Sequence, residues 1–302
     1  MDPKNLLLAA LLLITVLFVV FWTRVVRARQ VTPGGGSPGS WLGGHIGIGF
    51  VTNFFDTLGI GSFATTTALY RLRALVADEL VPGTLNVGHF LPTVAQALIY
   101  ITIVQVEFQT LALLILAAAG GSWIGAGIVA GMPRRQIQRG MGVALLVAAV
   151  LFVMGNLKWI PAGGEASGLQ GTLLAVGIGV NLLLGALMTL GVGLYAPCLI
   201  LVSLLGMNPI AAFPIMMGSC AFLMPVAGLR FIASGRYDLR AALGLALGGI
   251  PGVLIAAFVV KQLPLLWLRW LVVAVVLYAA LAMLRAALKG ASARSSQVAK
   301  SS

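Results

Sequence analysis

The sequence predicts an all-α, polytopic membrane protein with a duplicated core, and two observations support this prediction. First, 60% of the 302 residues are apolar and 9% are charged, with a mean hydropathy of +1.06, which no ordinary water-soluble domain shows. Second, the nine residues 57–65 (TLGIGSFAT) return 132 positions later in similar form at 189–197 (TLGVGLYAP). Nothing in the sequence alternates as the strands of a membrane β-barrel do. We therefore expect membrane-spanning helices in two related halves.

Several apolar runs are candidates for these helices, since a helix needs roughly 20 apolar residues to cross about 30 Å of hydrocarbon. Two glycine-rich segments, 41–70 and 172–206, lie among them and contain too many glycines for smooth helices. The apolar runs are Leu6–Phe21, Phe90–Val106, Thr110–Ala130, Val143–Met154, Pro209–Leu229, Ala241–Val260 and Leu265–Leu284.

The first element, residues 1–29, is expected to be a retained transmembrane helix rather than a signal peptide. Only Lys4 precedes its apolar run, and no small-x-small cleavage site directly follows the run. Arg24, Arg27 and Arg29 come after it, which places the N-terminus outside by the positive-inside rule. The Pro- and Gly-rich residues 30–40 are expected to form a flexible cytoplasmic linker, and residues 290–302 a disordered cytoplasmic tail.

The basic residues also decide how the segment 41–70 meets the membrane. If it crosses once, five arginines fall outside, against the positive-inside rule. If it enters from the cytoplasm and turns back at its glycines, these five become cytoplasmic, and so do all Lys and Arg except Lys4, Lys158, Lys261 and Arg269. We therefore predict a re-entrant hairpin. The five arginines are Arg71, Arg73, Arg134, Arg135 and Arg139.

This topology makes the two halves an inverted repeat. Each half, 41–158 and 171–289, becomes one re-entrant hairpin followed by three transmembrane helices, which is an odd number of crossings. The halves must then have opposite orientations, and their glycine motifs meet from opposite faces near the midplane. Glycine-interrupted apolar segments at corresponding places in two halves indicate a transporter's substrate site.

The motif itself resembles that of a known family. Each half carries a Gly, nine further residues and then Thr-Leu-Gly-x-Gly, as Gly47–Thr65 and Gly179–Pro197. This pattern resembles the TauE/SafE sulfite exporter family, also called the toluene-sulfonate uptake permease family, over roughly 41–288. Asn53, Asp56 and Ser62 stand where that family usually has small residues and a third Gly, which suggests a divergent branch. The resemblance implies gradient-coupled transport of small inorganic or organic sulfur anions across a bacterial inner membrane.

The residues of the two motifs suit an anion site. A hairpin broken at its glycines leaves helix N-termini with unpaired N–H groups and a positive dipole end. The neighbouring hydroxyls add neutral donors, from which a substrate is more readily released than from buried arginines. The alternative is that these small residues merely permit close helix packing. The predicted substrate-binding residues are Thr57, Gly59, Gly61, Ser62, Thr65, Thr66, Thr189, Gly191, Gly193 and Tyr195.

Asp56 is the one acidic residue deep in an apolar run, and its counterpart in the second half is Met188. An intramembrane carboxylate is costly and indicates a function. Asp56 is predicted to be the coupling-ion residue, carrying a proton or binding Na⁺ together with Asn53. A purely structural helix cap is the competing interpretation.

Other features give a competing function and exclude others. Met216, Cys220 and Met224 share one helical face, and Cys198 follows the second motif, so a channel-like or Cu(I) permease is an alternative. A methionine in a helix more often fills space between packed side chains than binds a metal. The net charge of +12 is scattered at the ends of apolar runs, which argues against nucleic acid as a partner. Without a convincing carboxylate pair, His cluster or P-loop, we expect no enzyme, no resident metal and no cofactor. A homo-oligomer stays open, as do the roles of Cys198 and Cys220.

Overall fold

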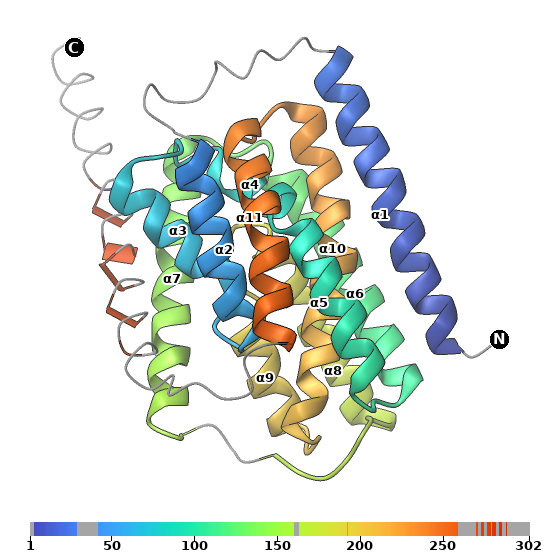
Figure 1. The fold of residues 1–302 in the computed structure, drawn as a ribbon. Coiled ribbons are helices and arrows are strands. Elements are labelled where there is room, and N and C mark those ends of the chain that lie inside the picture. Colours follow the sequence, from blue (N-terminus) through green and yellow to red (C-terminus); the bar gives the residue numbers. More distant parts are fainter. Residues whose placement is uncertain are drawn as a thin grey trace, which may run out of the picture.

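The computed structural model describes residues 3–28, 42–159, 163–191 and 193–258, together with separate positions between 270 and 288. The predicted linker 30–40 and tail 290–302 lie outside the described residues, as does most of the last apolar run. Every regular element in the described ranges is a helix, so the predicted all-α class is confirmed. Figure 1 shows these helices packed side by side, with α1 along one flank of the bundle.

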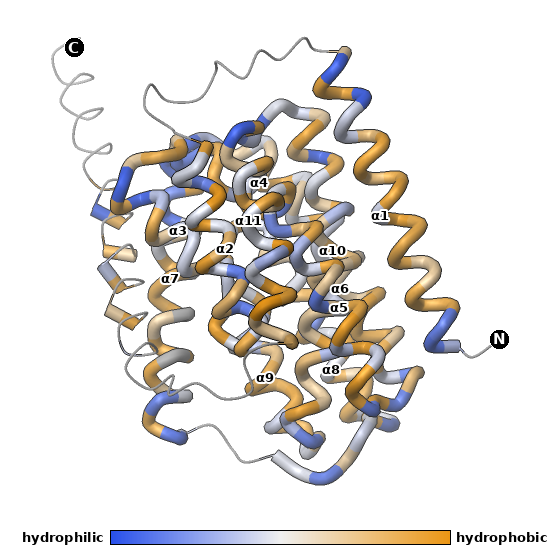
Figure 2. Tube along the Cα trace, in the orientation of Figure 1, coloured by the Kyte–Doolittle hydropathy of each residue, from blue (hydrophilic) through white to orange (hydrophobic). Residues whose placement is uncertain are grey.

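The helices, in chain order, are α1 (Pro3–Ala28), α2 (Leu42–Thr57), α3 (Ser62–Arg73), α4 (Val81–Gly88), α5 (Phe90–Ile103), α6 (Phe108–Val129), α7 (Arg134–Asn156), α8 (Gly171–Met188), α9 (Tyr195–Leu204), the 3₁₀ turn η1 (Pro209–Ala211), α10 (Ala212–Ser234) and α11 (Leu239–Phe258). Within the described ranges, six helices are long and apolar enough to cross a membrane: α1, α6, α7, α8, η1 with α10, and α11. Figure 2 shows that apolar residues dominate along these helices and that polar residues gather toward their ends. The polytopic membrane class follows.

The structure refines two predicted segments. The run 90–106 forms the 14-residue helix α5, shorter than the six long helices, and the separate short helix α4 precedes it. The turn at Glu107 then begins α6, because the Glu107 carboxylate accepts a hydrogen bond from the Thr110 amide at 3.2 Å. The two glycine-rich segments each form two helices: α2 and α3 in the first half, and α8 and α9 in the second.

The two halves pack crosswise through glycines. Helix α2 lies along α11, and α8 lies along α6. A methyl group on Gly248 of α11 would lie 1.9 Å from the Ile46 carbonyl oxygen, and one on Gly121 of α6 would lie 1.8 Å from that of Leu182. Small residues therefore bring these backbones together, as they do in other membrane bundles. The first helix of each half contacts a later helix of the other half.

Basic side chains gather at one end of the bundle. Arg71, at the end of α3, binds Asp78 at 2.8 Å, and Arg134, at the start of α7, approaches the same carboxylate at 3.5 Å. The guanidinium of Arg236 donates to the Met132 carbonyl at 3.0 Å. Lys158 follows the other end of the 23-residue helix α7, about 35 Å away at 1.5 Å per residue. This agrees with the predicted placement of Arg71 and Arg134 on one face, while the cytoplasmic identity of that face stays a prediction.

Candidate functional site

The two glycine turns have the same backbone conformation. Gly59 has φ of +89° and Gly191 has φ of +93°, a left-handed region that residues with side chains rarely adopt. The amide of Gly59 donates to the Asp56 carbonyl at 2.9 Å, and the amide of Gly191 donates to the Met188 carbonyl at 2.9 Å. In each half a left-handed glycine therefore ends the first helix, as at many helix C-termini. The repeated Thr-Leu-Gly encodes this break.

The second glycine of each motif brings the two turns together. A methyl group on Gly61 would lie 3.9 Å from Cβ of Tyr195, and one on Gly193 would lie 4.0 Å from Cβ of Phe63. Gly61 directly precedes α3, and Gly193 lies two residues before α9. The starts of α3 and α9 therefore face one another, although 132 residues separate the motifs.

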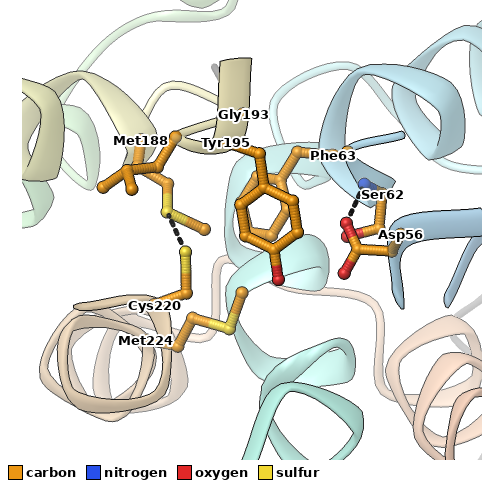
Figure 3. A pocket seen from close by; sticks show the side chains of 10 residues that line it. Asp56, Ser62, Phe63, Met188, Gly193, Tyr195, Cys220 and Met224 are labelled. Carbon is orange, nitrogen blue, oxygen red and sulfur yellow. Dashed lines mark hydrogen bonds between the residues drawn. The ribbon is translucent and has the colours of Figure 1, made fainter. Parts of the chain in front are cut away.

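A small pocket lies between these turns, and it is referred to below as the cavity. Figure 3 shows Asp56 and Ser62 on one side, the Tyr195 ring across the middle, and sulfur-containing side chains on the other side. The cavity therefore has a polar wall and a soft, apolar wall, and both halves contribute to it. Its lining residues are Asp56, Gly61, Ser62, Phe63, Met188, Gly193, Leu194, Tyr195, Cys220 and Met224.

Asp56 caps the start of α3 across the turn. Its side chain is 1% exposed; one carboxylate oxygen accepts from the Ser62 amide at 2.5 Å, and the other from Nε2 of Gln96 at 2.9 Å. A carboxylate at a helix N-terminus satisfies an orphan N–H group and meets the positive end of the helix dipole. These contacts offset part of the cost of burying the carboxylate.

Gln96, on α5, links this cap to the second half. Its Nε2 also donates to the Thr57 hydroxyl at 2.9 Å, and its Oε1 accepts from the Tyr195 hydroxyl at 2.9 Å. A continuous hydrogen-bonded chain, from Asp56 through Gln96 to Tyr195, therefore joins the two turns. The sequence indicates Gln96 only as a polar residue in an apolar run, because its three partners lie 39, 40 and 99 residues away.

The start of α9 differs chemically from the start of α3. Leu194 caps it without any side-chain hydrogen bond in the described part of the chain. Met188 stands at the position that corresponds to Asp56 and has no group that could accept from an amide as a carboxylate does. One helix start at the cavity therefore carries an internal anion, while the other carries none.

The remaining predicted site residues do not line the cavity. The Thr57, Thr65 and Thr189 hydroxyls donate to backbone carbonyls one turn earlier. Asn53 donates to the Gly49 carbonyl at 2.7 Å and contacts the His89 ring, while Thr66 binds the other ring nitrogen of His89 at 3.0 Å. The left-handed glycines shape the turns from outside the cavity: Gly59 is exposed beside Phe213, and Gly191 lies near Met141.

Three sulfur atoms form the soft wall. Cys220 and Met224 come from the helical face noted in the sequence, and the Cys220 thiol contacts the Met188 thioether at 3.5 Å. Cys198 and Met216 are buried but do not line the cavity. No group of three or more His, Cys, Asp or Glu residues within the described residues could hold a metal ion.

These features define a polytopic helical membrane protein with a buried site where two broken helices meet. The family model for the sulfite exporter TauE/SafE matches residues 2–152, half of the chain, and the chain therefore belongs to this family of membrane transporters. The match includes α1, which the motif resemblance left outside, and ends before the second motif. No curated protein and no solved structure matches the chain in the corresponding searches.

Proposed function

We propose that this protein is a secondary transporter of small sulfur-containing anions such as sulfite or organosulfonates, with the cavity between the two turns as its substrate site. The observation that carries the proposal is that both copies of the duplicated motif contribute to one buried cavity, and that this cavity has an uncapped helix start. Membership of the sulfite exporter family supports the class of substrate.

The cavity offers an anion neutral donors. The start of α9 presents the N–H groups of Tyr195 and Ala196, since Pro197 has none, together with the positive end of the helix dipole. The side chain of its N-cap residue, Leu194, forms no capping hydrogen bond. The Ser62 side chain lines the opposite wall. No Lys or Arg is among the described lining residues, so the anion would be held without a full opposite charge. Such binding suits a carrier, because the substrate must also leave.

The soft wall favours anions with an apolar or polarizable end. A sulfonate carries its charge at one end and a hydrocarbon group at the other, so its oxygens can face α9 while its tail contacts Met188, Cys220 and Met224. Thiosulfate offers a polarizable sulfur in place of the tail. Methionine and cysteine side chains adapt to such groups.

Asp56 couples transport to protons in this proposal. Its carboxylate occupies the Ser62 amide, a donor that an incoming anion would otherwise use, and its negative charge repels that anion. A proton on Asp56 removes the charge and weakens its hold on the amide, so proton and anion bind together. The amide of Asn53 is engaged by Gly49 and His89, which favours a proton over Na⁺. If Asp56 serves only as a cap, a neutral cap will transport equally well.

Alternating access would follow from the inverted arrangement of halves 41–158 and 171–289. In this arrangement α2–α3 is a re-entrant hairpin from the cytoplasm, and α8–α9 is one from the opposite side. The N-terminus would lie outside and the C-terminus in the cytoplasm, in a bacterial inner membrane. The similar turns and the crosswise packing of α2 on α11 and of α8 on α6 support this arrangement.

Uptake into proteoliposomes tests the proposal. The purified protein should accumulate labelled methanesulfonate, thiosulfate or sulfite under an imposed pH gradient, and a Na⁺ gradient should not replace the pH gradient. Uptake of Cu(I) in place of these anions would instead support the soft-metal permease. Anion flux that no gradient can drive uphill would support a channel.

A further inference from the structure

A column of buried polar side chains runs inside the first half, from Asp56 at the cavity toward the start of α2. On α2 it consists of His45, Asn53 and Asp56, which share one helical face with Gly49. The distance along the axis from His45 to Asp56 is about 16 Å at 1.5 Å per residue, about half of the hydrocarbon thickness. Every buried residue of α2 is polar or glycine.

Two further helices line the same column. On α3, Ser62, Thr66 and Tyr70 recur every four residues, and the ring centroids of Tyr70 and His45 lie 5.5 Å apart. The other helix is α5, which follows His89 directly and carries Thr93 and Gln96 at the fourth and seventh positions after it. All three of these side chains are fully buried. The column therefore passes His45, Tyr70, Thr66, His89, Thr93 and Gln96 before it reaches Asp56.

Several groups in the column have no hydrogen-bond partner among the described residues. These groups are both ring nitrogens of His45, the Tyr70 hydroxyl and the Thr93 hydroxyl. Buried polar groups are almost always satisfied, if not by protein then by internal water. Four such atoms between α2, α3 and α5 therefore indicate bound water between the partnered side chains.

His89 can pass a proton along this column without leaving its place. One ring nitrogen lies 3.0 Å from the Thr66 hydroxyl and the other 3.0 Å from the Asn53 amide. The Thr66 hydroxyl can either donate or accept, and the Asn53 amide places both its nitrogen, at 3.0 Å, and its oxygen, at 3.1 Å, near the second ring nitrogen, so either ring nitrogen can carry the proton. A proton taken up at one nitrogen can then be released from the other.

We propose that this column is a proton path that connects Asp56 with the end of the bundle where Arg71, Arg134 and Arg236 gather. The inference rests on the proposed function, since it supplies the proton that Asp56 carries. A proton reaches the buried His45 from that end, moves through bound water and His89, and binds the Asp56 carboxylate. On the other side of Asp56 the cavity is lined by Met188, Cys220 and Met224.

The ionisable groups around the path fit this direction. His45 faces Tyr70 of α3, and Asp238 and Arg240 at the start of α11 act on it electrostatically, so the path begins beside charged groups. Among the described residues, His89 contacts Asn53, Thr66 and the Phe63 ring. The ionisable groups around Asp56 are Tyr100 of α5, Tyr195 of α9 and Cys220 of α10.

The test uses variants that remove unpartnered groups without disturbing a hydrogen bond. Thr93→Val removes a hydroxyl that has no hydrogen-bond partner among the described residues, and His45→Phe keeps an aromatic ring against Tyr70. Thr102→Val is the matched control, because Thr102 lies on the same helix but is exposed, and its hydroxyl bonds only to the Leu98 carbonyl one turn earlier. Each full-length variant is reconstituted in proteoliposomes with a pH-sensitive dye inside.

Two rates are compared with labelled methanesulfonate, whose charge does not change with pH. We expect both path variants to slow proton-coupled net flux by about tenfold or more, since loss of a proton-transfer group typically costs ~10²–10⁴ in a rate that it limits. Exchange of labelled for unlabelled anion at equal, acidic pH on both sides needs no net proton movement and should stay near wild type. Thr102→Val should change neither rate.

Net flux at the wild-type rate in both path variants would overturn the proton path. A fall in exchange that parallels the fall in net flux would also overturn it, because that result indicates structural damage. Wild-type protein that neither exchanges nor accumulates methanesulfonate, thiosulfate or sulfite would refute the proposed function itself, and the path with it.

Discussion

The turn at Gly59 and the turn at Gly191 share a backbone but differ in chemistry. Both use a left-handed glycine and the same backbone hydrogen bond to end a helix. Three residues before that glycine, however, the first turn has Asp56 and the second has Met188. Glycine therefore sets the backbone conformation of the break, while one side chain, Asp56 or Met188, decides whether a carboxylate of the protein meets the start of the next helix. The duplication supplies two breaks, and only the first has a carboxylate at the next helix start.

The largest expected effect comes from breaking the shared backbone. Gly59→Leu and Gly191→Leu should each lose most transport while some folded protein reaches the membrane, because a left-handed residue with a side chain costs about 1–2 kcal/mol. The loss would arise from a displaced helix start. Uptake assays and melting of the purified variants in detergent measure both effects.

The two leucine variants should differ in stability. A methyl group on Gly191 would lie 3.3 Å from Cε of Met141, whereas one on Gly59 would come no closer than 3.8 Å to the Phe213 ring. Gly191→Leu should therefore melt at the lower temperature. Wild-type transport by either variant would contradict the role of the turns.

The next effect comes from making the second turn resemble the first. Met188→Asp places a carboxylate where it can cap the start of α9, so the cavity gains a second internal anion. We expect anion binding to fall by about tenfold or more, since a like charge in a water-poor site costs more than 1.4 kcal/mol. Met188→Asn has a similar shape without the charge and should bind more tightly than Met188→Asp. Equal affinities for the two variants, measured by isothermal titration with methanesulfonate, would argue against an anion site at α9.

A smaller effect is expected from cutting the link between the turns. Tyr195→Phe leaves Oε1 of Gln96 buried without its partner, which should cost about 1–3 kcal/mol of stability. Tyr278→Phe, at an exposed position, is the control and should have little effect. The melting temperatures of the two variants in the same detergent provide the comparison. Equal melting temperatures would mean that the hydrogen bond contributes little to joining the halves.

The smallest effect concerns the soft wall. Cys220→Ala should change the preference for thiosulfate over sulfite by only a few-fold, about 1 kcal/mol or less, because single contacts with polarizable groups are weak. Cys198→Ala is the matched control, since Cys198 is equally buried but does not line the cavity. Competition of each anion with labelled methanesulfonate gives the ratio. An unchanged ratio in Cys220→Ala would remove this thiol from substrate selection.

The sequence predicted the breaks well because glycine is nearly the only residue that tolerates their backbone angles. The repeated motif therefore placed both turns, and hydropathy placed most of the long helices. The sequence also indicates that Asp56 can cap a helix, because carboxylates are favoured at helix N-termini. The local signal was sufficient in each of these cases.

The contacts of the site could not be predicted in the same way. Gln96 meets Asp56 and Tyr195 only because α5 packs between segments that are distant in the chain, and no periodic pattern encodes that packing. Met188 lies in the soft wall beside Cys220 for the same reason, because helix packing brings these distant residues together. From the sequence, the hydroxyls near the motifs are all candidate donors to the substrate. In the structure, the hydroxyls of Thr57, Thr65 and Thr189 instead donate hydrogen bonds to backbone carbonyls one turn earlier.

The most direct test of the account is proton-driven anion uptake by Asp56→Asn. The carboxamide of the substituted side chain can still accept a hydrogen bond from the Ser62 backbone N–H, so the cap and the cavity should persist. The side chain can no longer take up or release a proton. We predict that the variant binds methanesulfonate with an affinity that no longer depends on pH, and that a pH gradient no longer drives accumulation. Gradient-driven uptake equal to that of the wild type would show that Asp56 is only a helix cap and would contradict the coupling mechanism.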